Sequence, residues 1–560
     1  MPQYALGVDY GTNSVRALVV DIATGEELGT GIWPYATGEQ GVWLDPKDPH
    51  LARQHPLDYA NGFYEAVSMA LEASGVNPAD IIGIGVDTTG STPIPVNAQG
   101  IPLALLPEWQ GNLNAMAWLW KDHTGHAEAA EITALAKERR EPYLDKCGGA
   151  YSSEWFWAKI LRCKRVDPAV FEAAYSWVEA QDMIPAWLCG LPDADSIPRG
   201  ICAAGHKAMF HEDWGGLPSV EFLEELEPGL GTLRARLYAK TQSAGDLAGR
   251  LDAEIAARCG LRAGTPVSIG AFDAHLGAIG SGVKPGTLVK IMGTSTCDIM
   301  VGEPPEALIL GVCGVVPGSV IPGMIGIEAG QSAVGDLFNW WVNLVAPDEA
   351  ISPHLAPPGE RRSGGAGSSR HEHLATEAAK LRAGQSGLIA LDWNNGNRTI
   401  LVDPLLSGLI VGQTLHTSPA EIYRALIEAT AFGALTIIRR IEESGVPIQE
   451  VVVCGGIAEK SSLTMQIYAD VLNRPIKISA SAQTCALGAA IAGAVASGGH
   501  PDILTAQSAM VTTPIRTFVP SPEAVKTYEQ LYKIYSQLHD AFGIGDMASV
   551  MKNLVRLRTA

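Results

Sequence analysis

A short glycine–threonine turn follows an apolar segment in each half of this chain. In the first half, residues 4–9 and 15–21 flank Gly11-Thr12-Asn13-Ser14; in the second, residues 286–292 lead into Gly293-Thr294-Ser295-Thr296. Short apolar runs interrupted by polar turn residues predict a strand, a tight turn and a second strand in both places. The recurrence of this unit constrains the fold to two halves built on a related plan.

Further strands and helices alternate along the chain. Strands are predicted at residues 81–86 and 267–271. One helix begins at the capping box Ser418-Pro419-Ala420-Glu421, with apolar residues at helical spacing behind it. A second helix runs from Ser521 to Gly543. The alternation favours an α/β architecture.

Three other segments carry expectations about packing. Residues 485–496 are mostly alanine and glycine, too short to span a bilayer, and predict a tightly packed internal helix. Residues 357–369 are rich in glycine and serine and predict a solvated loop. Tyr528, Tyr532 and Tyr535 share one face of the last long helix. They form either a contact in a homodimer or, as is more common for such a stripe, part of the chain's own core.

Composition excludes several classes of protein. Among the 560 residues, 60 Asp and Glu outweigh 40 Lys and Arg, giving a net charge of −20, which argues against a nucleic-acid or anionic-membrane partner. The 47% of hydrophobic residues excludes disorder for the chain as a whole. Nine scattered cysteines without C-x-x-C spacing predict neither disulfides nor a zinc cluster, and the polar N-terminal segment is unlike a signal peptide. We therefore expect a cytoplasmic protein.

An acidic chain that handles phosphate needs a local positive field, and the first turn offers one. Backbone N–H groups at Gly11, with the side chains of Thr12 and Asn13, can cradle phosphate oxygens, and Arg16 adds a fixed positive charge. Asp9 ends the preceding strand, where it could hold Mg²⁺ through water. The alternative is an ordinary hairpin with a surface aspartate.

The second half offers two comparable segments. Gly293 and Thr294 have the composition of the first turn but no arginine nearby, and Lys290 belongs to the preceding strand. Gly455 and Gly456 follow an apolar strand, and paired glycines allow the backbone to approach a nucleoside closely. The alternative for the glycine pair is a plain strand-to-helix turn. A Walker A motif is absent, so any ATP site is built from the opposed turns.

Three charged residues lie among small or apolar neighbours. Asp273 is predicted at a strand end, where a carboxylate can take the proton from a hydroxyl that attacks a γ-phosphate, or can simply cap a loop. Lys207 and Glu328 require polar partners, which a polyol or a mutual salt bridge would supply. His371 and His373 have alternate spacing but no third ligand, so metal binding there is not favoured.

These segments resemble the FGGY carbohydrate kinases, within the actin-like sugar-kinase superfamily, over nearly the whole chain. The turn at Gly11 is similar to the family's first phosphate motif, Gly293-Thr294 to its second, and Gly455-Gly456 to its adenosine motif, while Asp273 matches its catalytic aspartate. The resemblance implies an α/β fold of two ribonuclease H-like domains flanking a cleft. Residues 1–282 would hold the sugar, the first phosphate motif and the catalytic aspartate, and residues 283–560 the second phosphate motif and the adenosine motif.

Six stretches resemble the family members that phosphorylate ribulose: residues 85–93, 119–123, 204–209, 214–219, 328–336 and 391–398. The resemblance implies ATP-dependent phosphorylation of L-ribulose at the C5 hydroxyl, in L-arabinose catabolism, by a magnesium-dependent enzyme whose partners are the sugar and MgATP. Alternatives are D-ribulose, D-xylulose, ribitol or glycerol as acceptor, or an actin-like ATPase or sensor without a sugar.

The residues matched to the family's functional positions fall into three groups. The implied sugar contacts are Pro95, in a substrate loop, and Lys207, Asp273 and Glu328. The implied ATP contacts are Gly11, Thr12, Asn13, Arg16, Gly293, Thr294, Gly455, Gly456 and Ser461, and the implied Mg²⁺ ligands are Asp9 and Asp273.

Overall fold

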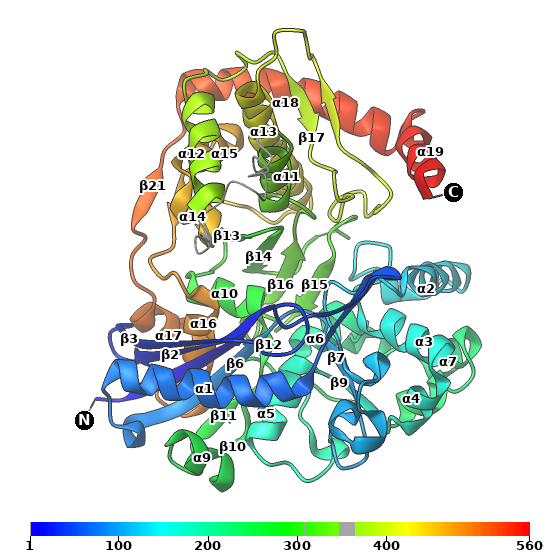
Figure 1. Cartoon of the computed structure of the whole chain (residues 1–560), viewed down its shortest axis with the longest axis vertical. Helices are drawn as coiled ribbons and strands as arrows, with labels where there is room; N and C mark the ends of the chain where they lie inside the picture. The colour runs from blue at the N-terminus through cyan, green and yellow to red at the C-terminus, as the bar shows by residue number, and fades with distance from the viewer. Residues whose placement is uncertain (1, 307, 346–364, 560) are drawn as a thin grey trace, which may run out of the picture.

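The computed structural model describes residues 2–306, 308–345 and 365–559, which form two lobes, each built on a mixed sheet (Figure 1). The first sheet has the order β10-β11-β6-β1-β2-β3, with β12 paired to β6. Its strands are β1 (Tyr4–Tyr10), β2 (Ser14–Asp21), β3 (Glu27–Pro34), β6 (Ile81–Thr88), β10 (Leu247–Arg250), β11 (Pro266–Ser268) and β12 (Ala271–Phe272).

The second sheet repeats this plan in the order β15-β16-β14-β13-β19-β20-β21. Its strands are β13 (Thr287–Met292), β14 (Thr296–Gly302), β15 (Gly314–Pro317), β16 (Ile325–Ala329), β19 (Glu450–Cys454), β20 (Ile476–Ile478) and β21 (Arg516–Phe518). In both sheets the first strand pairs antiparallel with the second and parallel with a later strand, β6 or β19. The relation between the two halves that the turns predicted is therefore present in the topology.

The long helices of the second half begin and end close to where the sequence predicted. Helix α13 spans Pro419–Glu442, and its capping box is complete: the Glu421 backbone N–H donates to the Ser418 hydroxyl, and the Ser418 N–H donates to the Glu421 carboxylate. Helix α18 spans Pro522–Gly543. Both helices have proline at their first position, but only α13 has a serine side-chain cap, since the Ser521 side chain makes no cap hydrogen bond; α18 ends at Gly543.

The tyrosine stripe of α18 packs on the chain's own core. Tyr528, Tyr532 and Tyr535 are all buried, with ring centroids 6.1, 6.0 and 5.3 Å from that of Phe432 on α13. This is the second of the two alternatives that the sequence left open. A homodimer would have to use another surface.

Helix α16 (Thr484–Ala496) joins the two halves. It belongs to the second half in sequence but packs against β1 and β6 of the first sheet and against α10 (Asp273–Gly280). A Cβ atom on Gly7 would lie 1.8 Å from the carbonyl oxygen of Ala486, and one on Gly85 1.8 Å from that of Ala489. The predicted internal helix is confirmed, and its small residues permit this close approach.

Three sequence expectations differ from the structure. The strand predicted at 267–271 is divided into β11 and β12. Pro95 lies within β7 (Pro93–Val96), paired with Trp177 of β9 (Ser176–Glu179), and not in a loop, because the proline-rich run fits a short buried edge. Of the loop predicted at 357–369, residues 357–364 lie outside the described part, and residues 365–369 begin helix α12 (Gly365–Ala379).

The remaining elements surround these two sheets. A helical region covers one side of the first lobe (Figure 1). The other helices are α1 (Pro56–Ser74), α2 (His126–Glu138), α3 (Phe156–Val166), α4 (Pro168–Ala173), α5 (Ala180–Leu188), α6 (Ile201–Lys207), α7 (Val220–Leu226), α8 (Leu230–Ala235), α9 (Ala253–Cys259), α11 (Gly335–Val345), α14 (Gly456–Lys460), α15 (Ser462–Leu472), α17 (Ile503–Met510) and α19 (Ala548–Thr559). Among the described residues, no helix is both long and apolar enough to cross a bilayer.

Candidate active site

Three carboxylates gather at the ends of neighbouring strands of the first sheet. Asp9 of β1 lies beside Asp87 of β6 in the parallel register, and β12 pairs with β6 so that Ala271 lies opposite Asp87. Asp273 follows two residues later as the first residue of α10. Parallel pairing brings the carboxyl ends of these strands to one edge of the sheet, which is where ligands bind in open α/β sheets.

Asp87 was not singled out in the sequence, although it ends an apolar strand just as Asp9 does. It is fully buried, and among the described residues neither of its carboxylate oxygens has a hydrogen-bond donor. Burial raises the pKa of Asp87 well above its ordinary value, and the charges of Asp9 and Asp273 raise it further. Burial also raises the pKa of Asp9, an effect that the Arg16 guanidinium, 3.7 Å from the carboxylate, partly offsets.

These carboxylates fit a divalent cation. Two adjacent buried carboxylates, one without any donor, carry negative charge that nothing else in the described residues neutralises beyond Arg16. Carboxylate oxygens with water are the ligands that Mg²⁺ prefers. Asp9 and Asp87 are thus the residues best suited to hold it, and Asp273 lies near enough to raise the pKa of Asp87.

Asp273 lies between this carboxylate pair and a second charged group. Burial raises the pKa of Asp273 to about 7, Asp9 and Glu328 raise it, and the Ala274 N–H and the Lys207 ammonium lower it. The Ala274 N–H donates to the Asp273 Oδ1 at 2.6 Å. A carboxylate with this pKa can accept a proton near neutral pH, as a general base must.

Lys207 and Glu328 form an ion pair that bridges the two halves. Lys207 ends α6, and Glu328 belongs to β16. The Lys207 Nζ donates to the Glu328 Oε1 at 2.7 Å and to Oε2 at 3.0 Å. Burial alone would raise the pKa of Glu328 and lower that of Lys207. The charge of each partner outweighs burial, so the pKa of Glu328 lies well below its ordinary value and that of Lys207 well above. The salt bridge considered from the sequence is present, and the Glu328 side chain remains 12% exposed.

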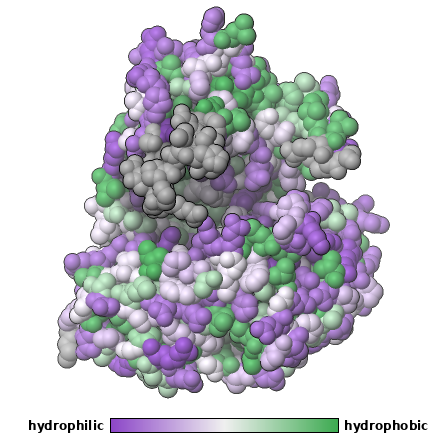
Figure 2. All heavy atoms as spheres, viewed as in Figure 1, coloured by the Kyte–Doolittle hydropathy of each residue, from purple (hydrophilic) through white to green (hydrophobic). Residues whose placement is uncertain are grey.

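A second ion pair across the halves escaped the sequence reasoning. The Arg398 guanidinium lies 3.3 Å from the Glu154 carboxylate. Arg398 ends one of the six stretches quoted above, but nothing local to it indicates a partner in the first half. The two bridges show that side chains from both halves meet at one place, and Figure 2 shows the surface hollowed between the lobes.

The two phosphate-binding turns differ in their surroundings. The first turn (residues 11–13) is closed by a hydrogen bond from the Gly11 N–H to the Ser14 carbonyl, and the Thr12 hydroxyl accepts from the Trp120 indole at 3.1 Å. In the second turn (residues 293–295), the carbonyls of Gly293 and Thr294 accept N–H groups from the start of α11. Gly293 and Thr294 are themselves exposed. In the first turn only Asn13 is exposed, and Gly11 and Thr12 are half-buried.

The glycine pair leads into a helix start. Gly455 has φ of 97°, and a Cβ there would lie 2.5 Å from the Met292 carbonyl oxygen, so this position requires glycine. A Cβ on Gly456 would meet nothing within 4 Å, which leaves open space above this residue. The Ser461 hydroxyl caps α15 by accepting from the Thr464 N–H at 3.3 Å. A nucleoside contact by Ser461 stays a prediction.

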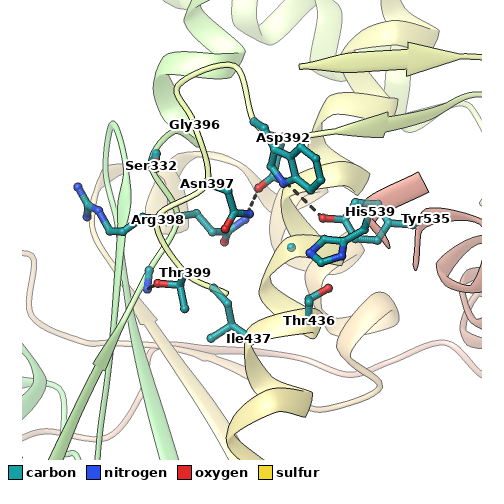
Figure 3. A pocket seen from close by; sticks show the side chains of 14 residues that line it. Ser332, Asp392, Gly396, Asn397, Arg398, Thr399, Thr436, Ile437, Tyr535 and His539 are labelled. Carbon is teal, nitrogen blue, oxygen red and sulfur yellow. Dashed lines mark hydrogen bonds between the residues drawn. The ribbon is translucent and has the colours of Figure 1, made fainter. Parts of the chain in front are cut away.

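A narrow, partly open pocket in the second half is too small for a sugar. Figure 3 shows Asp392 at its wall, accepting hydrogen bonds from Gln331 at 2.7 Å and from the Tyr535 hydroxyl at 3.4 Å. Its volume of about 10 Å³ is roughly that of a single water site. The cavity is therefore a structural feature of the second lobe and not the substrate site.

Both halves of the chain are similar to known carbohydrate kinases. Residues 4–280 match the model of the FGGY family of carbohydrate kinases, N-terminal domain, and residues 288–497 match that of the C-terminal domain. A ribulokinase of Anoxybacillus flavithermus is 43% identical over 99% of this chain and 96% of its own length; one of Geobacillus thermodenitrificans is 44% identical over the same shares. The crystal structure of a xylulose kinase from Rhodospirillum rubrum superimposes with a TM-score of 0.76 at 23% identity, covering 96% of this chain and 99% of that one. The two lobes thus have the actin-like fold of sugar kinases.

Proposed function

This chain belongs to the FGGY family of carbohydrate kinases, and from that premise we propose that it transfers the γ-phosphoryl group of ATP to the C5 hydroxyl of L-ribulose. The product is L-ribulose 5-phosphate, which places the enzyme in L-arabinose catabolism. The choice of L-ribulose is supported by curated ribulokinases at 43% and 44% identity over nearly the full chain.

One observation carries the chemistry. Asp273 interacts electrostatically with Asp9 on one side and with the Lys207–Glu328 pair on the other. A kinase needs its base between the group that binds the acceptor and the groups that hold the phosphates. Asp273 is the described residue that interacts with both groups.

The reaction that this geometry supports is a direct in-line transfer. The sugar hydroxyl gives its proton to the Asp273 carboxylate while its oxygen forms a bond to the γ-phosphorus. The bond between the γ-phosphorus and the β,γ-bridging oxygen breaks, and ADP leaves with that oxygen and the electron pair. The Gly11 and Gly293 N–H groups close their own turns by donating to Ser14 and Ser295. The next backbone N–H groups of the turns, the hydroxyls of Thr12 and Thr294, and the Arg16 guanidinium stabilise the charge that develops on the phosphoryl oxygens. When bound at Asp9 and Asp87, Mg²⁺ supplies charge neutralisation and orientation of the phosphates.

The acceptor is held by groups from both halves. Lys207 and Glu328 offer a donor and an acceptor at the sugar's hydroxyls, and the aromatic rings of Trp155 and Phe272 lie 5.5 and 5.6 Å from the Lys207 Nζ. Pro95 contributes through the backbone of β7. Residues 1–282 are proposed to hold most of the sugar, with Glu328 added from the second half, and residues 283–560 most of the nucleotide, through Gly455, Gly456 and Ser461. Closing the lobes on both substrates excludes water and limits ATP hydrolysis.

The test is ATP consumption measured over L-ribulose, D-ribulose, D-xylulose, ribitol and glycerol, with a no-sugar control. L-ribulose should give the highest kcat/KM, and the rate without sugar should be far lower. Phosphorus NMR of the product fixes the position of the phosphate. If L-ribulose is among the poorest acceptors, the substrate assignment fails; if ATP turns over equally without sugar, the chain acts as an actin-like ATPase.

A further inference from the structure

Two buried histidines beside Glu328 take no part in the proposed transfer. His206 precedes Lys207 on α6, and His275 lies in the first turn of α10, two residues after Asp273. Both are 1% exposed, and their ring centroids are 4.6 Å apart. They approach Glu328 from two different helices, so three elements converge on one carboxylate.

The three side chains are spaced as ligands of one metal ion. The Glu328 Oε2 lies 3.4 Å from the His206 Nδ1 and 3.7 Å from the His275 Nε2. Zinc–nitrogen and zinc–oxygen bonds of about 2.0–2.2 Å in tetrahedral geometry separate neighbouring ligand atoms by roughly 3.4 Å. One ligand atom from each of the three residues lies within 4.8 Å of the others.

The hydrogen bonds of the histidines leave the inward nitrogens available. His206 uses Nε2 toward the Ser319 hydroxyl at 3.0 Å, which orients the ring and directs Nδ1 at Glu328. Within the part of the chain that the structure describes, neither ring nitrogen of His275 has a hydrogen-bond partner. A buried imidazole without a partner costs free energy, because its desolvated polar atoms gain nothing in return. A bound cation would satisfy it.

The Lys207 ammonium weakens the binding of a metal ion beside Glu328 but does not prevent it. Its ammonium lies nearer to Oε1, at 2.7 Å, than to Oε2, at 3.0 Å, and the Cys313 thiol is also on the Oε1 side, at 4.0 Å. A carboxylate has two oxygens with about four lone-pair positions, so one oxygen can keep the ammonium while the other binds a cation. The nearby positive charge lowers the affinity and favours ions that bind imidazole strongly.

We propose that His206, His275 and Glu328 form a second metal site, selective for divalent transition-metal ions such as Zn²⁺. Two imidazoles and one carboxylate suit zinc, nickel or copper, whereas Mg²⁺ prefers the all-oxygen pair Asp9 and Asp87. Three protein ligands leave a position for water. Glu328 is also proposed to hold the sugar, so an ion at this site competes with the sugar and inhibits the kinase. This inhibition rests on the proposed function, whereas the binding of the metal does not.

The first experiment measures binding without substrates. Full-length, untagged protein is stripped with a chelator and titrated with Zn²⁺ by calorimetry and with Co²⁺ by its visible d–d absorption. One ion should bind per chain, and His275→Gln should weaken Zn²⁺ binding by more than the roughly 10- to 100-fold typical for loss of an outer hydrogen-bond partner. The control is His416→Gln, at an exposed histidine elsewhere, which should bind as the wild type does. Equal affinity in both variants overturns the proposal.

A measurement on the wild type keeps the proposal testable if the variant fails to fold. X-ray absorption at the zinc edge should show two imidazole nitrogens and at least one oxygen around the ion. A shell of oxygen alone, or one containing sulfur, overturns the proposal.

Kinetics then tests inhibition. With Mg²⁺ in excess, Zn²⁺ should raise the KM for L-ribulose and leave kcat and the KM for ATP unchanged, and chelation should reverse the effect. Inhibition that competes with ATP contradicts the assignment to this site. If L-ribulose is not phosphorylated at all, the proposed function fails while the binding titration still decides on the metal site.

Discussion

The two glycine–threonine turns have the same backbone plan and opposite charge arrangements. In the first half, Asp9 and Arg16 flank the turn, and the Arg16 side chain is 48% exposed. In the second half, Lys290 and Asp298 flank the turn from β13 and β14, 2.7 Å apart and with exposures of 0% and 1%. The first turn therefore keeps an exposed arginine only loosely paired, at 3.7 Å, with a largely buried aspartate, whereas the charges beside the second turn neutralise each other inside the lobe.

The difference indicates that the first turn belongs to the reaction centre and that the second turn has a structural role. The carboxylates of Asp9 and Asp273 are only partly compensated, and that of Asp87 has no donor among the described residues, so the group requires a cation or a proton to be stable. The Lys290–Asp298 pair requires nothing, because each partner satisfies the other, and Lys290 also donates to Gln331 at 3.2 Å. The second turn can then offer a neutral backbone cradle held on a rigid strand pair.

Breaking the buried pair tests the supporting function of the second half. Lys290→Met leaves the Asp298 charge buried and alone, which should cost about 3–5 kcal/mol of unfolding free energy. The double variant with Asp298→Leu should recover most of that loss, since two apolar groups need no partner. Chemical denaturation measures both. Lys284→Met, at a lysine that is 62% exposed, is the control and should change stability by less than about 1 kcal/mol.

Removing the base tests the chemistry of the first half. Asp273→Ala should lower kcat by about 10² or more, because proton transfer from the sugar hydroxyl loses its acceptor. ATP binding, followed by calorimetry, should persist because the phosphate-binding turns are untouched. Turnover near the wild-type value would falsify the assignment of Asp273.

The pH dependence of the same group follows from its raised pKa of about 7. Asp273 works only when deprotonated, so kcat/KM should rise as the pH rises through about 7 and should fall roughly tenfold per pH unit below it. Asp9→Asn removes a negative charge that raises this pKa, so the limb should move to lower pH whatever the absolute rate. Initial rates across the range locate it. A limb near the ordinary carboxyl pKa would contradict the electrostatic account.

Local signals sufficed for much of the fold and part of the site. The turns, the capping box at Ser418 and the position of Asp273 directly after a strand all follow from residues close in sequence, whereas the helix that begins at Asp273 was not predicted. Lys207 and Glu328 were expected to need partners because charged groups are seldom buried alone. Their mutual contact was one of two expectations because sequence does not give tertiary distance.

What sequence reasoning missed depends on long-range pairing. Asp87 becomes a site residue only because β6 lies parallel to β1, and Arg398 only because Glu154 lies opposite it. The docking of α16 on the first sheet depends on matching glycines far apart in the chain. The family resemblance placed Pro95 in a substrate loop, yet it lies in a short buried strand.

Asp87→Asn tests whether the first half gives up stability for function. Burial raises the pKa of the Asp87 carboxyl, so at neutral pH folding must either bury its charge or protonate it, and both cost free energy. The neutral amide avoids this cost, so without added metal the unfolding free energy should increase by about 1–2 kcal/mol. Kinase activity should fall, and the Mg²⁺ concentration for half-maximal rate should rise. Thermal unfolding with and without Mg²⁺ separates the two effects. A less stable variant would mean that the carboxylate has a partner in the native state.

The smallest effects distinguish the turns themselves. The Thr12 hydroxyl accepts from the Trp120 indole, so Thr12→Val leaves that donor without its partner and should cost about 1 kcal/mol of stability. Thr294 is exposed, and Thr294→Val should change stability by less than about 0.5 kcal/mol. Both variants should weaken ATP binding, because each removes a hydroxyl proposed to contact phosphate. Both losses of stability are measured by denaturation without nucleotide. Equal losses would mean that the Thr12–Trp120 hydrogen bond adds no stability to the first turn, and that the two turns differ only in their neighbouring charges.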